Sequence, residues 1–149
     1  MEKVCVLPAT CQAVLDILDE AFLSLKISGG YRELKVVIIG RSDLLGKPLY
    51  YYLSNKNINV ENIGKREFNE RIEQKKYLFD ADVVVSSTGI RHLVTGEMIK
   101  EGSIVVDVGE PRPDIDFNSV SKKAAFLTPV PGGVGPVTVV SLLRNCVKL

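Results

Sequence analysis

Hydrophobic residues follow two different spacings along the chain. The first set recurs at helical spacing near the N-terminus and consists of Val14, Leu18, Ala21 and Leu25. This set predicts an amphipathic helix over residues 11–26, with Thr10 as its N-cap. The pair Gly29-Gly30 then breaks the helical pattern. Residues 1–30 are therefore expected to form a leading helix and linker.

The rest of the chain, residues 31–149, alternates short runs rich in Val and Ile with segments of helical pattern. The runs with strand character are "KVVIIG" (35–40), "INVENI" (58–63), "DVVVSS" (82–87), "SIVVDVG" (103–109) and "AFL" (125–127). Helices are expected at 46–55, 68–79, near Glu97, at 118–124 and from Gly135 to the C-terminus. Apolar β-branched strands separated by helices are typical of a parallel sheet that is covered on both faces. The pattern predicts one α/β domain over residues 1–149, in three layers, with a mostly parallel sheet and helices on both faces.

Composition and charge narrow the classes of partner. A chain of 149 residues with 46% hydrophobic and 25% charged residues is suited to one well-formed core. Its 19 basic and 18 acidic residues nearly cancel and form no basic stripe, so nucleic acid is not an expected partner. No apolar run approaches the roughly 20 residues of a membrane span, and the start "MEKVCVLPAT" lacks a signal peptide's apolar stretch. We therefore expect a soluble, cytoplasmic protein that does not enter a membrane.

The few cysteines and the single histidine offer little chemistry. Cys5, Cys11 and Cys146 show no spacing typical of a zinc site or a disulfide framework, so we expect free, buried thiols and no metal. His92 is the only histidine and is expected at the surface.

The stretch "VVIIGRSDLLGKP", residues 36–48, places two glycines around an expected turn from a strand into a helix. It is not a Walker loop, because five residues separate Gly40 from Gly46 and Pro48 stands where the magnesium-binding hydroxyl belongs. It also departs from G-x-G-x-x-G, because Ser42 replaces the middle glycine. A strand, a tight loop and a helix with free N–H groups still suit an anion such as a pyrophosphate. The alternative is an ordinary strand-to-helix turn, in which glycine serves only the backbone.

A second glycine-rich stretch makes a resemblance specific. The segment "TPVPGGVGPVT", residues 128–138, holds three glycines and three prolines in front of an apolar helix. In order along the chain, "GRSDLLGKP", "STG", "IVVDVG" and "PVPGGVGPVT" resemble the cofactor-binding half of bifunctional methylenetetrahydrofolate dehydrogenase/cyclohydrolase over residues 7–149. The start "LPAT" resembles that family's entry to the helix between its two domains, although Ala9 and Cys11 depart from its pattern. The resemblance implies a Rossmann-like NAD(P)-binding domain.

The resemblance also implies an activity for a complete protein. Such enzymes oxidise 5,10-methylenetetrahydrofolate by hydride transfer to NADP or NAD and hydrolyse the methenyl product to 10-formyltetrahydrofolate. Their catalytic tyrosine and lysine lie in a preceding domain, so no catalytic residue is assigned in this chain, which we expect to be inactive alone. The expected partners are tetrahydrofolate derivatives, the preceding catalytic half and, in the complete protein, a second copy that forms a homodimer.

Site residues follow from the same resemblance. The residues expected to bind the cofactor are Gly40, Arg41, Ser42, Gly46, Lys65, Arg66, Thr88, Gly89, Gly109, Glu110 and Thr138. The residues expected to face the folate are Pro131, Gly132, Gly133 and Val134. The sequence departs from the family at Glu110, where an apolar residue is usual, and at Val137, where a methionine or another bulky residue is usual.

Charge near the end of the second strand favours NADP over NAD. Lys65 and Arg66 follow that strand and Arg41 lies in the neighbouring loop, so three cations are available to a 2′-phosphate. Glu61 opposes this interpretation unless its side chain faces away from the site, because NAD sites commonly place an acid there.

Other interpretations differ in class. Tyr52 and Lys56 have the spacing of a catalytic pair on adjacent helical turns, but we interpret this as coincidence and Asp107 as structural. The chain could instead be a stand-alone dinucleotide-binding module, either a sensor or a structural domain without catalysis. The intact segment 128–138 argues against both, because neither needs a loop built for a substrate.

Overall fold

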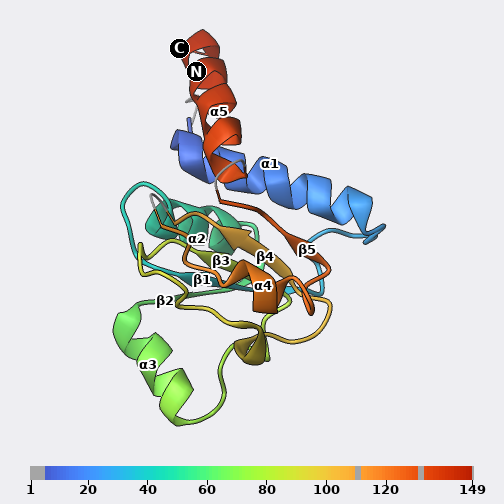
Figure 1. Ribbon diagram of the computed structural model, residues 1–149. Helices are drawn as coiled ribbons and strands as arrows, with labels where there is room; N and C mark the ends of the chain where they lie inside the picture. The colour runs from blue at the N-terminus through green and yellow to red at the C-terminus, as the bar shows by residue number, and fades with distance from the viewer. Residues whose placement is uncertain (1–5, 110–111, 131–132, 149) are drawn as a thin grey trace.

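The computed structural model describes residues 6–109, 112–130 and 133–148 and shows a five-stranded sheet in which every neighbouring pair is parallel. The strands are β1 (Lys35–Ile39), β2 (Asn59–Ile63), β3 (Val83–Ser86), β4 (Ile104–Asp107) and β5 (Phe126–Leu127). They are arranged in the order β2-β1-β3-β4-β5 (Figure 1). The predicted parallel α/β architecture is confirmed.

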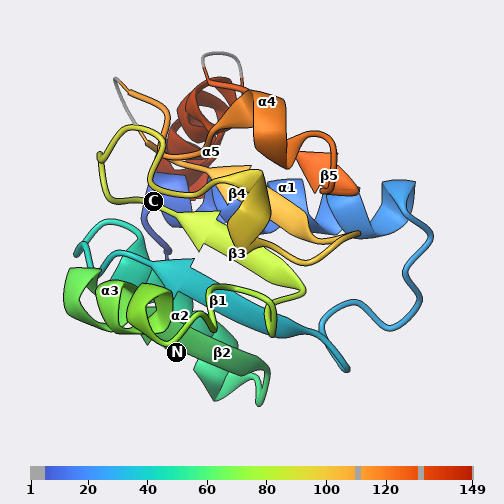
Figure 2. The same cartoon turned by 60° about the horizontal axis from the view of Figure 1, so that its bottom comes forward.

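Helices cover both faces of this sheet. They are α1 (Ala9–Ser24), α2 (Gly46–Asn55), α3 (Lys65–Glu73), the 3-10 turn η1 (Gly96–Met98), α4 (Phe117–Val120) and α5 (Val134–Lys148). The core on one face joins the sheet to α1 and α2, and the core on the other face joins it to α3, η1 and α4 (Figure 2). Helix α5 packs on α1 and extends away from the sheet (Figure 1). Among the helices described, none is long and apolar enough to cross a membrane.

Alternating strand residues supply the two cores. On β1, Val36 and Ile38 face the α1 and α2 side, whereas Val37 and Ile39 face the α3 side, and all four side chains are fully buried. A strand that is buried on both faces is apolar along nearly its whole length, which explains the continuous runs of Val and Ile in the sequence.

The strand order points to one position at the carboxyl end of the sheet, between β1 and β3. From β1 the chain crosses through α2 to β2 on one side, and the remaining strands are added on the other side of β1. The direction of winding therefore reverses between β1 and β3. In open parallel sheets, ligands bind at such a reversal, outside the carboxyl ends of the strands.

The predicted bounds of α1, α3 and α4 are wrong. Helix α4 spans Phe117–Val120 instead of 118–124. Pro8 is the N-cap of α1 and Thr10 lies inside its first turn. Helix α3 spans Lys65–Glu73 instead of 68–79. It begins early because the Glu67 carboxylate accepts the N–H of Gly64 at 3.0 Å, a capping interaction within a first turn that carries no apolar residue.

The thiol prediction is correct for one of the two cysteines that the structure describes. Cys11 is buried and free, and burial raises the pKa of its thiol to about 11. Cys146 is free but exposed. Cys5 lies outside the described residues. His92 is exposed, as expected.

A cluster of four charged side chains joins α3 to the sheet. The Arg71 guanidinium donates to Asp80 at 2.8 Å and to Glu61 at 2.6 Å. Lys35 pairs with both of the same acids. Glu61 therefore faces α3 and is held by two cations, which removes it as an acid for the end of β2.

This cluster predicts loss of stability in acid. Burial disfavours the charged form of Asp80, but hydrogen bonds and charges from Lys35 and Arg71 prevail and lower its pKa to about 2. The folded-state pKa lies below the usual value of about 3.9. The contribution of ionised Asp80 to the free energy of unfolding is therefore complete above pH 4 and is lost as the pH falls towards 2. Asp80→Asn should destabilise the fold by roughly 1–3 kcal/mol at pH 7 and flatten the acid dependence, as measured by urea unfolding.

Asp43→Asn is the matched control for this prediction. Asp43 pairs with Lys47 one helical turn away and is almost fully exposed, so its loss should change stability little. An Asp80→Asn protein with the acid dependence of the unmodified chain would contradict the role given to the cluster.

Candidate functional site

Three segments meet through their backbones at the carboxyl end of the sheet. A Cβ atom at Gly46, the first residue of α2, would lie 2.1 Å from the Gly40 carbonyl oxygen. A Cβ atom at Gly40 would lie 2.4 Å from the Ser87 carbonyl oxygen, and the φ of Gly40 is +111°. Only glycine fits at either position. We refer to this contact of Gly40, Gly46 and Ser87 as the glycine junction.

The loop between the two glycines presents free backbone donors. The Ser42 hydroxyl oxygen accepts the N–H groups of Leu45 and Gly46, both at 3.2 Å, and so caps the start of α2. Within the described part of the chain, the N–H groups of residues 41–44 donate to no protein acceptor. Free N–H groups before a helix N-terminus are a suitable environment for an anion.

The three predicted cations lie at the same end of the sheet. Arg41 Nη2 donates to Glu67 Oε1 at 2.7 Å and to the Asn62 carbonyl oxygen at 3.2 Å, which fixes the guanidinium at the end of β2. Lys65 and Arg66 open α3 and are exposed. The sequence did not reveal that acids accompany two of these cations, Glu67 beside Arg41 and Glu70 beside Arg66. The spacing of four residues from Arg66 to Glu70 was the available signal for the second pair.

A buried aspartate joins the loops that follow β3 and β4. Asp114 is fully buried, and its Oδ2 accepts the Ser86 hydroxyl at 2.7 Å, the Thr88 N–H at 2.6 Å and the Thr88 hydroxyl at 2.9 Å. Its Oδ1 has no hydrogen-bond partner among the described residues, and a Cβ atom at Gly109 would lie 2.4 Å from it. Asp114 therefore sets the position of Thr88, immediately before Gly89. Sequence reasoning missed this residue.

Asp107 organises the loop after β4. Its carboxylate accepts the N–H groups of Gly109 at 2.8 Å, Asp114 at 3.2 Å and Ile115 at 3.1 Å. Burial raises the pKa of Asp107 above its usual value, and these three hydrogen bonds oppose that rise. Both carboxylate oxygens are occupied by protein donors, which supports a structural role rather than that of a general base.

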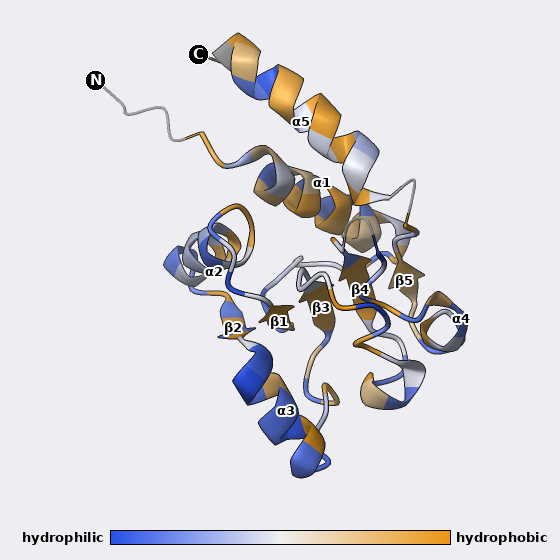
Figure 3. Ribbon diagram, turned by 60° about the vertical axis from the view of Figure 1, so that its left-hand side comes forward, coloured by the Kyte–Doolittle hydropathy of each residue, from blue (hydrophilic) through white to orange (hydrophobic). Residues whose placement is uncertain are grey.

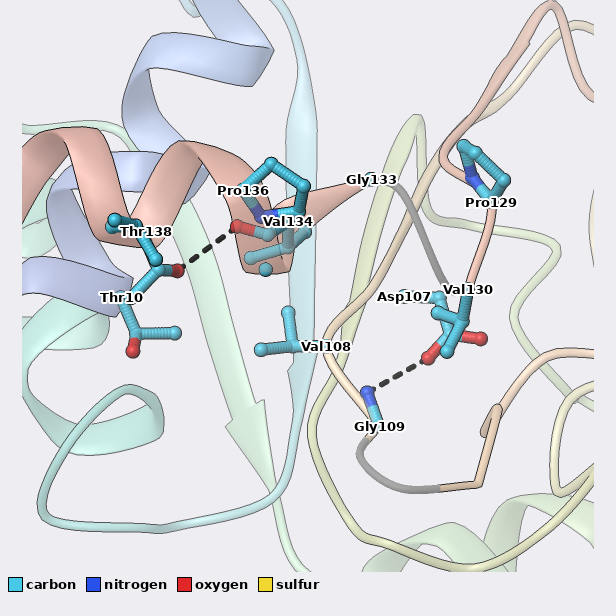
Figure 4. A pocket seen from close by; sticks show the side chains of 12 residues that line it. Thr10, Asp107, Val108, Gly109, Pro129, Val130, Gly133, Val134, Pro136 and Thr138 are labelled. Atoms are coloured by element: carbon cyan, nitrogen blue, oxygen red, sulfur yellow. Dashed lines mark hydrogen bonds between the residues drawn. The ribbon is translucent and has the colours of Figure 1, made fainter.

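A cavity of about 630 Å³ opens between the loops after β4 and β5 and the first turns of α1 and α5 (Figure 4). Four of the predicted site residues line it, namely Gly109, Gly133, Val134 and Thr138. The Thr138 hydroxyl donates to the Val134 carbonyl oxygen at 3.0 Å. The volume of the cavity is within the range of small-molecule sites. The predicted residues Glu110, Pro131 and Gly132 lie outside the described residues.

The tyrosine–lysine pair lies elsewhere. Lys56 Nζ is 4.6 Å from the centroid of the Tyr52 ring, a cation–π contact at the C-terminal end of α2. The glycine junction is at the opposite end of that helix. This placement agrees with the interpretation that the spacing of Tyr52 and Lys56 is a coincidence.

Comparison with known proteins identifies a family for almost the whole chain. Residues 8–149 match the family described as "Tetrahydrofolate dehydrogenase/cyclohydrolase, NAD(P)-binding domain". The bifunctional protein FolD of Methanosarcina barkeri is 40% identical over 144 residues, which cover 93% of this chain and 47% of that protein. The chain spans about half the length of the curated relatives it matches.

Solved structures agree with this match. The bifunctional FolD dehydrogenase/cyclohydrolase of Campylobacter jejuni superposes with a TM-score of 0.81 at 36% identity, over 95% of this chain and 49% of that one. The dehydrogenase-cyclohydrolase of Trypanosoma brucei, solved with NADP and an inhibitor, has a TM-score of 0.78 at 33% identity, over 95% and 50% of the two chains. A putative malic enzyme at 15% identity and a TM-score of 0.62 shares the fold alone.

The glycine junction predicts a large cost for a single methyl group. Gly46→Ala places a Cβ atom 2.1 Å from a backbone oxygen that cannot rotate away, so we expect a loss of roughly 2 kcal/mol or more in the free energy of unfolding. Gly102→Ala is the control: its φ is +79° but nothing lies within 4 Å, so a loss of about 1 kcal/mol is expected. Equal losses in urea unfolding would contradict the close contact.

Proposed function

The chain belongs to the family of the tetrahydrofolate dehydrogenase/cyclohydrolase NAD(P)-binding domain, and on this premise we propose that it is the cofactor-binding half of such an enzyme. The complete protein would oxidise 5,10-methylenetetrahydrofolate with NADP and hydrolyse 5,10-methenyltetrahydrofolate to 10-formyltetrahydrofolate. The observation that carries this proposal is the glycine junction of Gly40, Gly46 and Ser87 at the point where the sheet reverses its winding.

The residues present fit a dinucleotide. The free N–H groups of residues 41–44 would hold the pyrophosphate, and the glycine junction leaves no side chain in its way. The adenosine ribose would lie towards Gly64, where β2 ends and α3 begins. The nicotinamide would lie towards Thr88 and Gly109, beside the cavity lined by Gly133 and Thr138.

Charge supports NADP as the preferred dinucleotide. Arg41, Lys65 and Arg66 stand at the end of β2 and can contact a 2′-phosphate. Glu61 is held by Lys35 and Arg71 on the side facing α3. The Trypanosoma brucei structure, which contains NADP, adds support from a relative of 33% identity.

In this proposal, the chemistry is divided between this chain and a catalytic half, which would correspond to the part of the relatives' length that this chain does not cover. NADP, when bound, would accept the hydride from the folate methylene carbon. This chain's own residues would bind and orient the dinucleotide, and the cavity beside Gly109 and Thr138 would hold the folate ring against it. Proton transfer and water activation would belong to the other half.

Helix α5 offers a surface for that other half. Its outward residues are large, apolar and exposed, and they are Val139, Val140, Leu142, Leu143 and Val147. Figure 3 shows this hydrophobic helix extending beyond the body of the molecule. An apolar helix face of this kind is typical of an interface. We include in the proposal that the catalytic half packs against α5 and that the complete protein is a homodimer.

Calorimetric titration of NADP and NAD into the chain tests the proposal. We expect NADP to bind more tightly, with an affinity that falls more steeply with salt. Arg41→Ala combined with Lys65→Ala should weaken NADP by about 2–3 kcal/mol and leave NAD nearly unchanged, because only NADP carries the 2′-phosphate.

Arg32→Ala combined with Lys122→Ala is the control, because it removes two exposed charges that precede β1 and β5 and therefore lie at the amino end of the parallel sheet. Equal weakening of both dinucleotides by the Arg41 and Lys65 changes would contradict the placement of the 2′-phosphate. Binding of neither dinucleotide to the unmodified chain would contradict the proposed function. Tight binding with no effect of a supplied catalytic half would favour a stand-alone dinucleotide-binding module.

A further inference from the structure

Glu67 stands where a dinucleotide's adenosine ribose would lie, although the proposed function does not use it. Its Oε1 accepts Arg41 Nη2 at 2.7 Å, and its Oε2 accepts the Gly64 N–H at 3.0 Å. A Cβ atom at Gly64 would lie 3.0 Å from Glu67 Oε2 and 3.3 Å from Arg41 Nη1. The carboxylate and the guanidinium therefore lie together against the end of β2.

Glu67 is ionised at neutral pH. Hydrogen bonds from backbone N–H groups, and then from Arg41, hold the pKa of its carboxyl below the usual value. An incoming 2′-phosphate would thus meet a guanidinium that already carries one anion. The two anions would share Arg41 at close range, and like charges repel.

The pair is accessible and adaptable. The Arg41 side chain is 50% exposed and that of Glu67 is 37% exposed, so a ligand can reach both groups. An ion pair at this exposure contributes little to the stability of the fold. Its geometry can therefore respond to whichever ribose is bound.

Other acids of this region are engaged elsewhere. Glu61 is held by Lys35 and Arg71, and Glu70 pairs with Arg66 one turn further along α3. Within the residues that the structure describes, Glu67 is the acid that pairs with Arg41. An acid just past the second strand is also the group that accepts a ribose 2′-hydroxyl in NAD sites.

We propose that Glu67 is a specificity-determining residue that reduces the difference in affinity between NADP and NAD. Its carboxylate accepts the 2′-hydroxyl of NAD and repels the 2′-phosphate of NADP. The inference rests on the proposed function and deepens it. Arg41 and Lys65 attract the 2′-phosphate, and Glu67 weakens that attraction. The site therefore accepts both dinucleotides.

Glu67→Gln tests the inference with little change of shape. The Gln amide oxygen can still accept the Gly64 N–H, so the start of α3 is kept. We expect the Kd for NADP to fall roughly three- to tenfold and the Kd for NAD to stay the same or rise, so that the ratio of the two shifts towards NADP. The shift should shrink at high salt, because it is electrostatic.

Glu73→Gln is the matched control, since it removes the same charge from the last residue of α3. An unchanged ratio of NADP to NAD affinity in Glu67→Gln, or an equal shift in Glu73→Gln, would overturn the inference while the proposed function stands. Failure of the unmodified chain to bind either dinucleotide would overturn the proposed function and this inference with it.

Discussion

The contact of backbone with backbone at Gly40, Gly46 and Ser87 is the constraint on which the rest of the site depends. Helix α2 can begin directly at the end of β1 only because no side chain separates them. The end of β3 approaches the same point, since β3 is the neighbour of β1 in the sheet. The free N–H groups of the loop and the entry of α2 both follow from this close approach.

Buried aspartates perform the corresponding task at the carboxyl ends of β3 and β4. Asp107, at the end of β4, accepts hydrogen bonds from the loop that follows it, and Asp114 in that loop accepts hydrogen bonds from Thr88 in the loop after β3. Their carboxylates cost free energy to bury, and each is compensated by several donors. Gly109 thereby gains a fixed position in the wall of the cavity, and Thr88 gains one after the end of β3.

Sequence reasoning succeeded where the signal was local. The strands β1, β3 and β4 were predictable because burial on both faces demands continuous apolar residues, and α2 was predictable from the glycine that begins it. The start of α3 was missed because its first turn carries only charged residues. Arg41 was foreseen as a free cation because its acidic partner lies 26 residues away, where no spacing rule applies. The same limit concealed Asp114, whose partners at Ser86 and Thr88 become neighbours only when the sheet forms.

The division of labour within this site has an evolutionary consequence. The glycine junction is made of backbone atoms, whereas Arg41 and Glu67, which we propose to lie beside the ribose, are accessible side chains on a loop and on the first turn of a helix. Mutations can therefore alter the second set freely while the first set tolerates almost none. Under the proposed placement, related proteins that share this frame would change between NADP and NAD through single substitutions, without rebuilding the backbone that holds the dinucleotide.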